Sequence, residues 1–249
     1  MIETHITQLN SPQGMIDLGS GNPDPALFPF SALKTASERY FAISDPRTLQ
    51  YGAEQGNGFF LEALSHFLSP HYGFEVDTRN LFATTGASSA LDLLCTLFTR
   101  PGDTIFVEEP SYFLALRIFA DHGLRVLSYP MDENGLEIDG IEESILVHQP
   151  KFIYTVPTFH NPASVTLSQQ RREHLVHLSQ KHNVLIFADE VYHFLPYTQA
   201  PPAPFAAYTN DLEQVIPLII TLQFLGYPVD NLKTEWFQSL PTKTARWNR

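Results

Sequence analysis

The segment with the clearest chemical potential is Asn183–Tyr197, in which an apolar run ends at two acids and is followed by Tyr192. The run Val184–Ala188 is typical of a strand buried on both faces of a sheet. In open α/β sheets, ligand groups gather just past the carboxyl ends of such strands. A buried carboxylate is costly unless it meets a cation. Asp189 is therefore predicted to face a cationic ligand group or, as the alternative, to cap the next segment or pair with an arginine.

A second candidate site follows the strand predicted over residues 81–84, where a turn at Gly86 leads into a helix from Ser88. Helix N-termini carry unpaired N–H groups and the positive end of the macrodipole, which suit a phosphate. Hydroxyls at Thr85 and Ser89 add donors to this turn. The signal is weak by itself, because glycine followed by serine also starts ordinary helices. The turn is not the G-x-G-x-x-G pattern of a dinucleotide site.

Two more predicted strands are followed by candidate ligand-binding side chains, an aromatic ring after one strand and an amide after the other. The strand at residues 104–107 leads to Tyr112, which can pack in the core or stack on a flat ligand. The strand at residues 152–156 leads to Asn161, which lies between prolines. Its amide can face a polar ligand group, or the segment can simply be a turn.

These four groups depend on elements that alternate along the chain. Helical spacing predicts helices over residues 31–43, with Ser31 as the N-cap, and over residues 59–68 and 168–182. A further short strand is predicted over residues 125–129. Alternating strands and helices predict a three-layer α/β/α fold with a mainly parallel sheet.

Composition narrows the class of protein. The chain is 43% hydrophobic, which allows a substantial core. Its length of 249 residues corresponds to one large domain or two small ones. A net charge of -12 without a Lys/Arg cluster argues against binding to nucleic acid or an anionic membrane surface. The single cysteine, Cys95, excludes an internal disulfide and fits a reducing compartment. With no secretory signal at the start and no apolar run long enough to span a bilayer, the expectation is a soluble, cytoplasmic protein.

Together the four groups suit a ligand with a phosphate, a flat ring, a ring hydroxyl and a cationic ring nitrogen, which is pyridoxal 5'-phosphate (PLP). Here the sequence resembles the class I/II aminotransferases of PLP fold type I. It is most similar to 2-aminoadipate-type aminotransferases and the aminotransferase-like domains of MocR regulators. Order and spacing agree over roughly residues 16 to 197. The matching segments are D-L-G-S-G-N-P-D-P-A-L-F-P, L-Q-Y-G-A-E-Q-G, T-T-G-A-S-S-A-L-D-L-L, E-E-P-S-Y-F, H-N-P and A-D-E-V-Y.

The resemblance implies a set of cofactor contacts. The start of one helix would hold the phosphate, and one aromatic ring would stack on the pyridine ring. Two polar side chains would bond the phenolic oxygen, and one carboxylate would pair with the protonated ring nitrogen and keep the ring an electron sink. In that order, the residues are Gly86, Ala87 and Ser88, then Tyr112, then Asn161 and Tyr192, and finally Asp189.

The resemblance also implies partners. Tyr51 resembles the tyrosine that reaches the phosphate of the neighbouring subunit, which implies a homodimer. Gly19, Ser20 and Gly21 resemble the loop that lines the substrate side. The implied substrates are an amino acid and a 2-oxo acid.

The sequence departs from the family pattern after about Val215. In the family, a Ser-rich strand end a few dozen residues past the D-E-V-Y segment delivers the lysine that forms the Schiff base. The only lysines after Tyr192 are Lys233 and Lys243, and neither has a matching context. We therefore expect a C-terminally truncated chain without the small C-terminal domain. Its predicted divisions are an N-terminal arm and first helix at 1–50, a PLP-binding large domain at 51–215 and a divergent tail at 216–249.

Three functions remain open at this point. The first is a PLP-dependent aminotransferase whose chemistry is impaired in this chain, because the missing lysine is both the Schiff-base partner and the proton shuttle. The second is a non-catalytic PLP-binding or interaction protein. The third is an unrelated α/β nucleotide or phosphate binder, which leaves the contexts of Asn161 and Asp189 unexplained.

Overall fold

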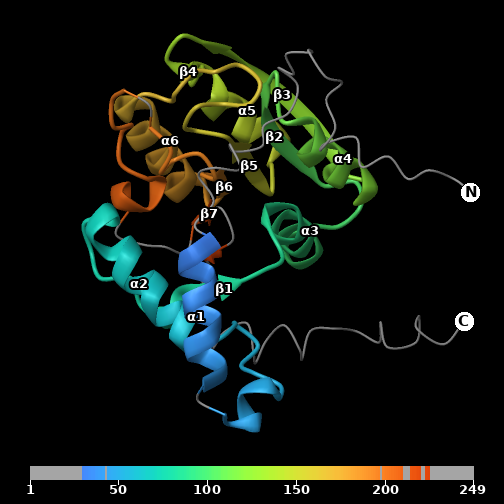
Figure 1. The fold of residues 1–249 in the computed structure, drawn as a ribbon. Helices are drawn as coiled ribbons and strands as arrows, with labels where there is room; N and C mark the ends of the chain where they lie inside the picture. Colours follow the sequence, from blue (N-terminus) through green and yellow to red (C-terminus); the bar gives the residue numbers. More distant parts are fainter. Residues whose placement is uncertain (1–29, 43, 197, 210–213, 220–221, 225–249) are drawn as a thin grey trace, which may run out of the picture. The chain divides into compact units, whose positions relative to one another are not determined.

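The computed structural model describes residues 30–42, 44–196, 198–209, 214–219 and 222–224. The chain divides into two compact units, Met1–Tyr51 and Gly52–Arg249. The first contains helix α1 (Phe30–Ala42) and the short 3-10 helix η2 (Pro46–Leu49) (Figure 1). Helix α1 buries none of its own residues. It begins at Phe30, so Ser31 lies inside its first turn and the prediction of Ser31 as the N-cap was wrong.

The second unit is built on an eight-stranded sheet in the order β1-β8-β7-β6-β5-β2-β3-β4. The strands are β1 (Leu81–Ala83), β2 (Thr104–Glu109), β3 (Arg125–Asp132), β4 (Gly135–Leu136), β5 (Phe152–Thr155), β6 (Leu185–Asp189), β7 (Val215–Ile219) and β8 (Leu222–Phe224). The helices are α2 (Gly58–Tyr72), η3 (Thr78–Asn80), α3 (Ala87–Phe98), α4 (Phe113–Asp121), α5 (Ile141–His148), α6 (Gln169–His182) and η4 (Phe205–Tyr208).

The sheet is mainly parallel, as the sequence predicts. Strands β3, β2, β5, β6 and β7 form consecutive parallel pairs, and only the pairs with β4 and β8 are antiparallel. From β2 the chain moves outward to β3 and then returns to β5 on the other side of β2. The strand order therefore reverses between β2 and β5, which is where open α/β sheets bind ligands.

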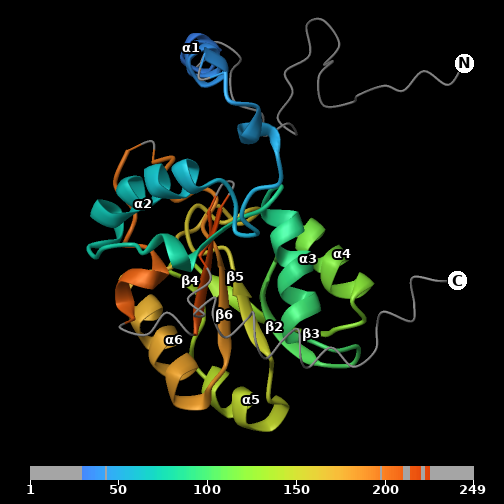
Figure 2. The ribbon, with the colours of Figure 1, turned by 90° about the horizontal axis from the view of Figure 1, so that it is seen from below.

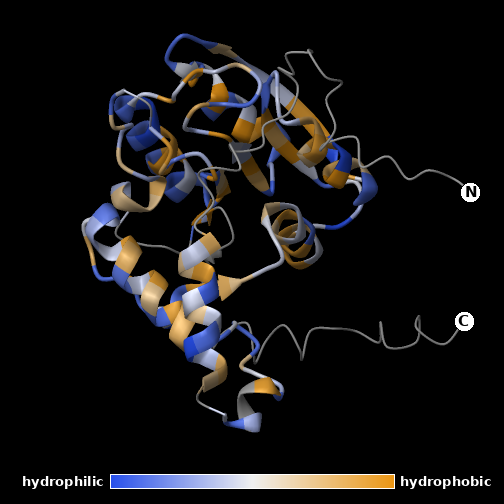
Figure 3. Cartoon of the chain, in the orientation of Figure 1, coloured by the Kyte–Doolittle hydropathy of each residue, from blue (hydrophilic) through white to orange (hydrophobic). Residues whose placement is uncertain are grey.

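Side chains alternate between the two faces of the sheet along each central strand. On β5, Phe152 and Tyr154 pack in the cluster formed with α3 and α4, whereas Ile153 packs in the cluster formed with α5 and α6. Figure 2 shows these helix pairs on opposite sides of the strands. Because both faces are covered, the strands are largely hydrophobic throughout (Figure 3). The predicted three-layer α/β/α class is confirmed.

Helix α2 is longer than predicted because its apolar stripe continues. Leu61, Leu64 and Leu68 are buried as expected, and Tyr72 extends the same face by one more turn. The helix is capped by Asn57, whose side chain accepts a hydrogen bond from the Phe60 amide at 3.2 Å.

Helix α5, strands β4, β7 and β8 and the short 3-10 helices were not predicted from the sequence. Strand β7 begins at Val215 and pairs with β6, so the predicted division at residue 215 falls at the first residue of a sheet strand. Among the helices described, none is long and apolar enough to cross a membrane.

Candidate functional site

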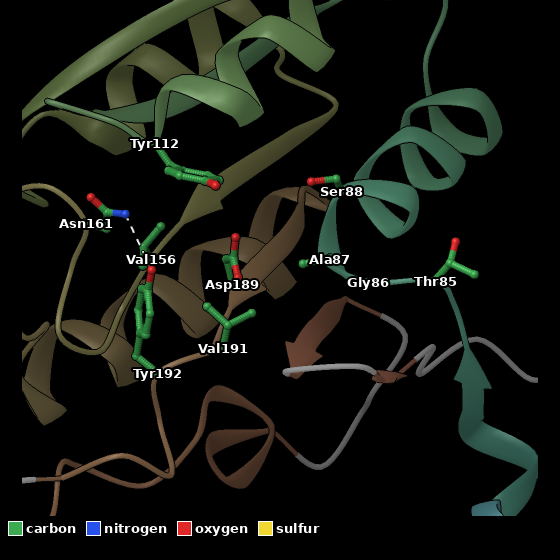
Figure 4. Close-up of a pocket in the computed structure, with 10 residues that line it drawn as sticks. All are labelled: Thr85, Gly86, Ala87, Ser88, Tyr112, Val156, Asn161, Asp189, Val191 and Tyr192. Carbon is green, nitrogen blue, oxygen red and sulfur yellow. Dashed lines mark hydrogen bonds between the residues drawn. The ribbon is translucent and has the colours of Figure 1, made fainter. Parts of the chain in front are cut away.

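The four groups predicted at strand ends lie around a single pocket at the carboxyl edge of the sheet (Figure 4). The turn after β1, the loop after β2, the loop after β5 and the end of β6 all contribute residues. The lining consists of Thr85, Gly86, Ala87, Ser88, Tyr112, Val156, Asn161, Asp189, Val191 and Tyr192. Val156 and Val191 were missed, because their only sequence signal is a position close after a strand.

The N-terminus of α3 forms one wall of this pocket. Gly86 occupies the N-cap position with φ 98°, a backbone conformation that glycine adopts without strain, and no side chain caps the first amides. The Ser88 side chain points into the group of lining residues, whereas Thr85 points away (Figure 4). The Ser89 hydroxyl lies 2.9 Å from the Thr85 hydroxyl and is not part of the lining. The open amides and the Ser88 hydroxyl make this wall suitable for an anion.

Aromatic rings and an amide form the opposite side. The Asn161 amide donates to the Tyr192 hydroxyl over 3.4 Å (Figure 4). Tyr112 is half-buried at the start of α4, and burial, with smaller effects of Tyr192 and Asp189, raises the pKa of its hydroxyl. Tyr112 is therefore a neutral hydrogen-bonding ring at physiological pH.

Asp189 ends β6 and is only 4% exposed. Its Oδ2 accepts a hydrogen bond of 2.7 Å from the Tyr154 hydroxyl, whereas its Oδ1 is buried without a hydrogen-bond partner. Burial raises the pKa of Asp189 to about 6, against the lowering effects of Tyr154 and of the Val191 amide. The carboxylate is thus mostly ionised at neutral pH, and its Oδ1 accepts no hydrogen bond of good geometry within the described chain.

A buried arginine lies near the end of β6, but it contacts Glu190, the residue after Asp189. Arg172 is fully buried, and its Nη1 lies 3.6 Å from Oε1 of Glu190. Its Nη2 donates to the Pro157 carbonyl at 2.7 Å and its Nε to the Leu167 carbonyl at 3.0 Å. Among the described residues no arginine pairs with Asp189, as the predicted alternative had it, because the alternation along β6 directs the two acids to different faces.

A second buried carboxylate, Glu108 at the end of β2, anchors the loop that carries Asn161. It accepts hydrogen bonds from the Thr155 hydroxyl at 2.5 Å and the Val156 amide at 2.7 Å. His160 places Nε2 at 3.1 Å from Oε2 of Glu108, an electrostatic contact without the alignment of a hydrogen bond. The His160 Nδ1 accepts from the Ala163 amide at 3.1 Å, which fixes the ring next to Asn161. This anchor was not predicted from the sequence.

Several predicted site residues are not among the lining residues of this pocket. Tyr51 belongs to the first unit, where its side chain is exposed. Gly19, Ser20 and Gly21 lie outside the described residues, as do Lys233 and Lys243. Among the described residues that line the pocket, none is a lysine. The described part of the chain also contains no group of His, Cys, Asp or Glu residues that could hold a metal ion.

Comparisons with known proteins find relatives over most of the chain. The profile of the family described as "Aminotransferase class I and II" matches residues 13–222. "Aromatic-amino-acid aminotransferase 1" of Thermococcus litoralis is 30% identical over 211 residues, which cover 83% of this chain and 51% of that protein. "Uncharacterized HTH-type transcriptional regulator YisV" of Bacillus subtilis is 30% identical over 205 residues, covering 81% and 41%.

Solved structures share the fold. The crystal structure of Pyrococcus horikoshii kynurenine aminotransferase, in complex with PMP, KYN and KYA, superposes with a TM-score of 0.76 at 27% identity. The match covers 87% of this chain and 58% of that one. The chain spans about half the length of the curated relatives that it matches.

Proposed function

Because the chain belongs to the class I and II aminotransferase family, we propose that its pocket binds PLP and that the protein transfers amino groups between amino acids and 2-oxo acids. The observation that carries this proposal is Oδ1 of Asp189, a buried carboxylate oxygen without a partner at the pocket. An uncompensated buried charge is costly. A protonated pyridine nitrogen supplies the missing cation.

The remaining lining groups fit the other parts of the same molecule. The uncapped amides of α3 and the Ser88 hydroxyl suit the phosphate, and Tyr112 offers a flat face for the pyridine ring. Asn161 and Tyr192 present polar groups 3.4 Å apart for the phenolic oxygen. When bound, PLP supplies an electron sink for bonds at the α-carbon of an amino acid. The protein's part is to orient the ring and to keep its nitrogen protonated through Asp189.

A second candidate is a PLP-binding protein without catalysis, and a specific observation favours it. No lysine lies among the described residues lining the pocket, and amino-group transfer in this family depends on one. The similarity to the regulator YisV is compatible with a retained cofactor shell that serves another purpose.

One experiment separates the two candidates. The purified chain is incubated with PLP, reduced with borohydride and mapped by peptide mass spectrometry. In parallel, amino-group transfer to 2-oxoglutarate is assayed with aromatic amino acids, kynurenine and 2-aminoadipate as donors. Turnover with a reduced adduct on Lys233 or Lys243 supports the aminotransferase. Saturable binding without adduct or turnover supports the non-catalytic binder, and no saturable binding contradicts both.

We also propose a homodimer in which Tyr51 contacts the phosphate of the neighbouring subunit. The exposure of the Tyr51 side chain supports this role, because it leaves the hydroxyl accessible. Light scattering of the PLP-loaded protein tests the assembly, and a monomer would contradict it.

The cytoplasmic location and the division at residues 1–50, 51–215 and 216–249 stay predictions. The buried thiol of Cys95 supports the first of these.

A further inference from the structure

We propose that Tyr154 is a positioning residue for the cofactor, because its hydroxyl holds one oxygen of Asp189 and leaves the other directed at the ring nitrogen. This inference rests on the proposed function, since it assigns a role to Tyr154 within the same PLP site. Tyr154 itself does not line the pocket. It acts through Asp189.

The contact follows from the register of the sheet. Tyr154 on β5 lies directly opposite Phe187 on β6. Side chains two residues apart on a strand share a face, so Asp189 projects on the same side as Phe187 and Tyr154. The hydroxyl reaches Oδ2 of Asp189 at 2.7 Å. The pairing is therefore fixed by two neighbouring parallel strands rather than by a loop.

Packing holds the Tyr154 ring independently of Asp189. Tyr154 has no exposed surface, and the Phe119 ring of α4 lies edge-on to it at a centroid distance of 5.3 Å. Phe119 in turn contacts Phe152, at a centroid distance of 5.5 Å. A ring held in this way presents its hydroxyl at a fixed place, and the carboxylate must orient toward it.

Fixing Oδ2 makes the two carboxylate oxygens unequal. Oδ2 receives a hydrogen bond, whereas the buried Oδ1 has no partner in the described chain. A hydrogen bond between an ionised carboxylate and a charged donor is stronger than one between neutral groups. The protonated ring nitrogen therefore finds its strongest acceptor at Oδ1, in a single orientation of the ring.

The charges around Asp189 agree with this role. The titratable groups that interact electrostatically with Asp189 are Tyr154 on β5, Glu108 on β2, Tyr112 at the start of α4 and, directed to the other face of the sheet, the adjacent Glu190. Burial, then the negative charge of Asp189, raises the pKa of Tyr154 well above its ordinary value, so Tyr154 stays a neutral donor. Its hydrogen bond lowers the pKa of Asp189, which burial, with a smaller contribution from Glu108, raises. Tyr154 thus keeps the carboxylate ionised where the cofactor needs it.

The test compares Tyr154→Phe with Tyr72→Phe, a matched loss of one hydroxyl from another buried tyrosine, outside the pocket. Two quantities are measured. The first is the titration of the Asp189 carboxyl carbon by ¹³C NMR in the protein without PLP. The second is the PLP dissociation constant at pH 7, from the quenching of intrinsic fluorescence.

We expect Tyr154→Phe to raise the pKa of Asp189 and to weaken PLP binding about tenfold, the loss typical of a hydrogen bond to a charged group. Tyr72→Phe should change neither quantity. A Tyr154→Phe protein whose carboxyl titration and PLP affinity match those of Tyr72→Phe would overturn the proposal and leave the proposed function intact. A wild-type protein that titrates as expected but does not bind PLP would instead contradict the proposed function, and with it the role of Tyr154 toward the cofactor.

A second variant covers the case in which Tyr154→Phe does not fold. Incorporation of 3-fluorotyrosine at position 154 keeps the shape of the ring and makes the hydroxyl a stronger donor. The pKa of Asp189 should then fall. A purely structural role for Tyr154 predicts an unchanged carboxyl titration.

Discussion

At the scale of single residues, Asp189 and Glu190 are adjacent buried acids with different surroundings. Glu190 lies 3.6 Å from the Arg172 guanidinium and accepts a hydrogen bond of 2.9 Å from the Phe205 amide. Each acid has one buried oxygen without a hydrogen-bond partner, Oε2 of Glu190 and Oδ1 of Asp189, but Asp189 has only the Tyr154 hydroxyl at 2.7 Å and no arginine among the described residues beside it. Glu190 is therefore a structural acid, whereas Asp189 is available to a ligand. Only the second requires a cation from outside the described chain.

This difference predicts that Asp189 lowers the free energy of unfolding of the protein without PLP, by an amount that increases with pH. Because burial raises its pKa from 3.8 to about 6 in the folded state, the unfolded state binds fewer protons between these values. The free energy of unfolding should therefore fall as the pH rises through this window, by about 3 kcal/mol in total. Asp189→Asn removes this dependence.

Urea unfolding of wild type and Asp189→Asn between pH 4 and pH 7 measures the effect. The advantage of the variant should grow with pH and then level off above the pKa of Asp189. The pKa of His193, which burial lowers to about 4, acts in the opposite direction in both proteins and cancels in the difference. A difference that does not change with pH would contradict the assignment.

At the scale of elements, each candidate group follows a strand whose carboxyl end lies at one edge of the sheet. The loop after β5 is held from the neighbouring strand β2, through Glu108 and its contacts with Thr155, Val156 and His160. Asn161 is the next residue along this loop. Its position is therefore determined by a side chain on another strand as well as by its own backbone.

Glu108→Gln should loosen this loop. Glutamine can place its oxygen on the Val156 amide and its NH₂ on the Thr155 hydroxyl, but both hydrogen bonds lose the carboxylate charge, at about 1–3 kcal/mol of unfolding free energy. PLP affinity should fall as well, because Asn161 loses its support. The matched control is Glu109→Gln, which alters the adjacent exposed acid. Thermal unfolding and PLP titration of both variants test this, and equal effects of the two substitutions would contradict the anchor.

At the scale of the whole molecule, strand and helix periodicity predicted the three-layer fold and the strand ends that meet at the pocket. Three pocket residues were identified because each follows a recognisable apolar run: Asp189, Tyr112 and Asn161. Tyr154 and Glu108 were not. Tyr154 lies within a predicted strand and Glu108 directly after one, and their roles depend on which strands are neighbours. Residues 216–219 were assigned to a divergent tail because the resemblance to the family fades after about Val215. Their place in the sheet depends on pairing with β6, a non-local contact.

The central claim is that Asp189 provides the charge that binds PLP. The most direct measurement is an equilibrium PLP titration of wild type, Asp189→Asn and Glu190→Gln at pH 7, followed by absorbance and fluorescence. We predict saturable binding to wild type, weakened at least about tenfold by Asp189→Asn, since a charge-assisted hydrogen bond is lost. Glu190→Gln changes an equally buried acid outside the pocket lining and should leave the dissociation constant within about threefold of wild type. Absence of saturable binding to wild type, or equal affinities for wild type and Asp189→Asn, would contradict the claim.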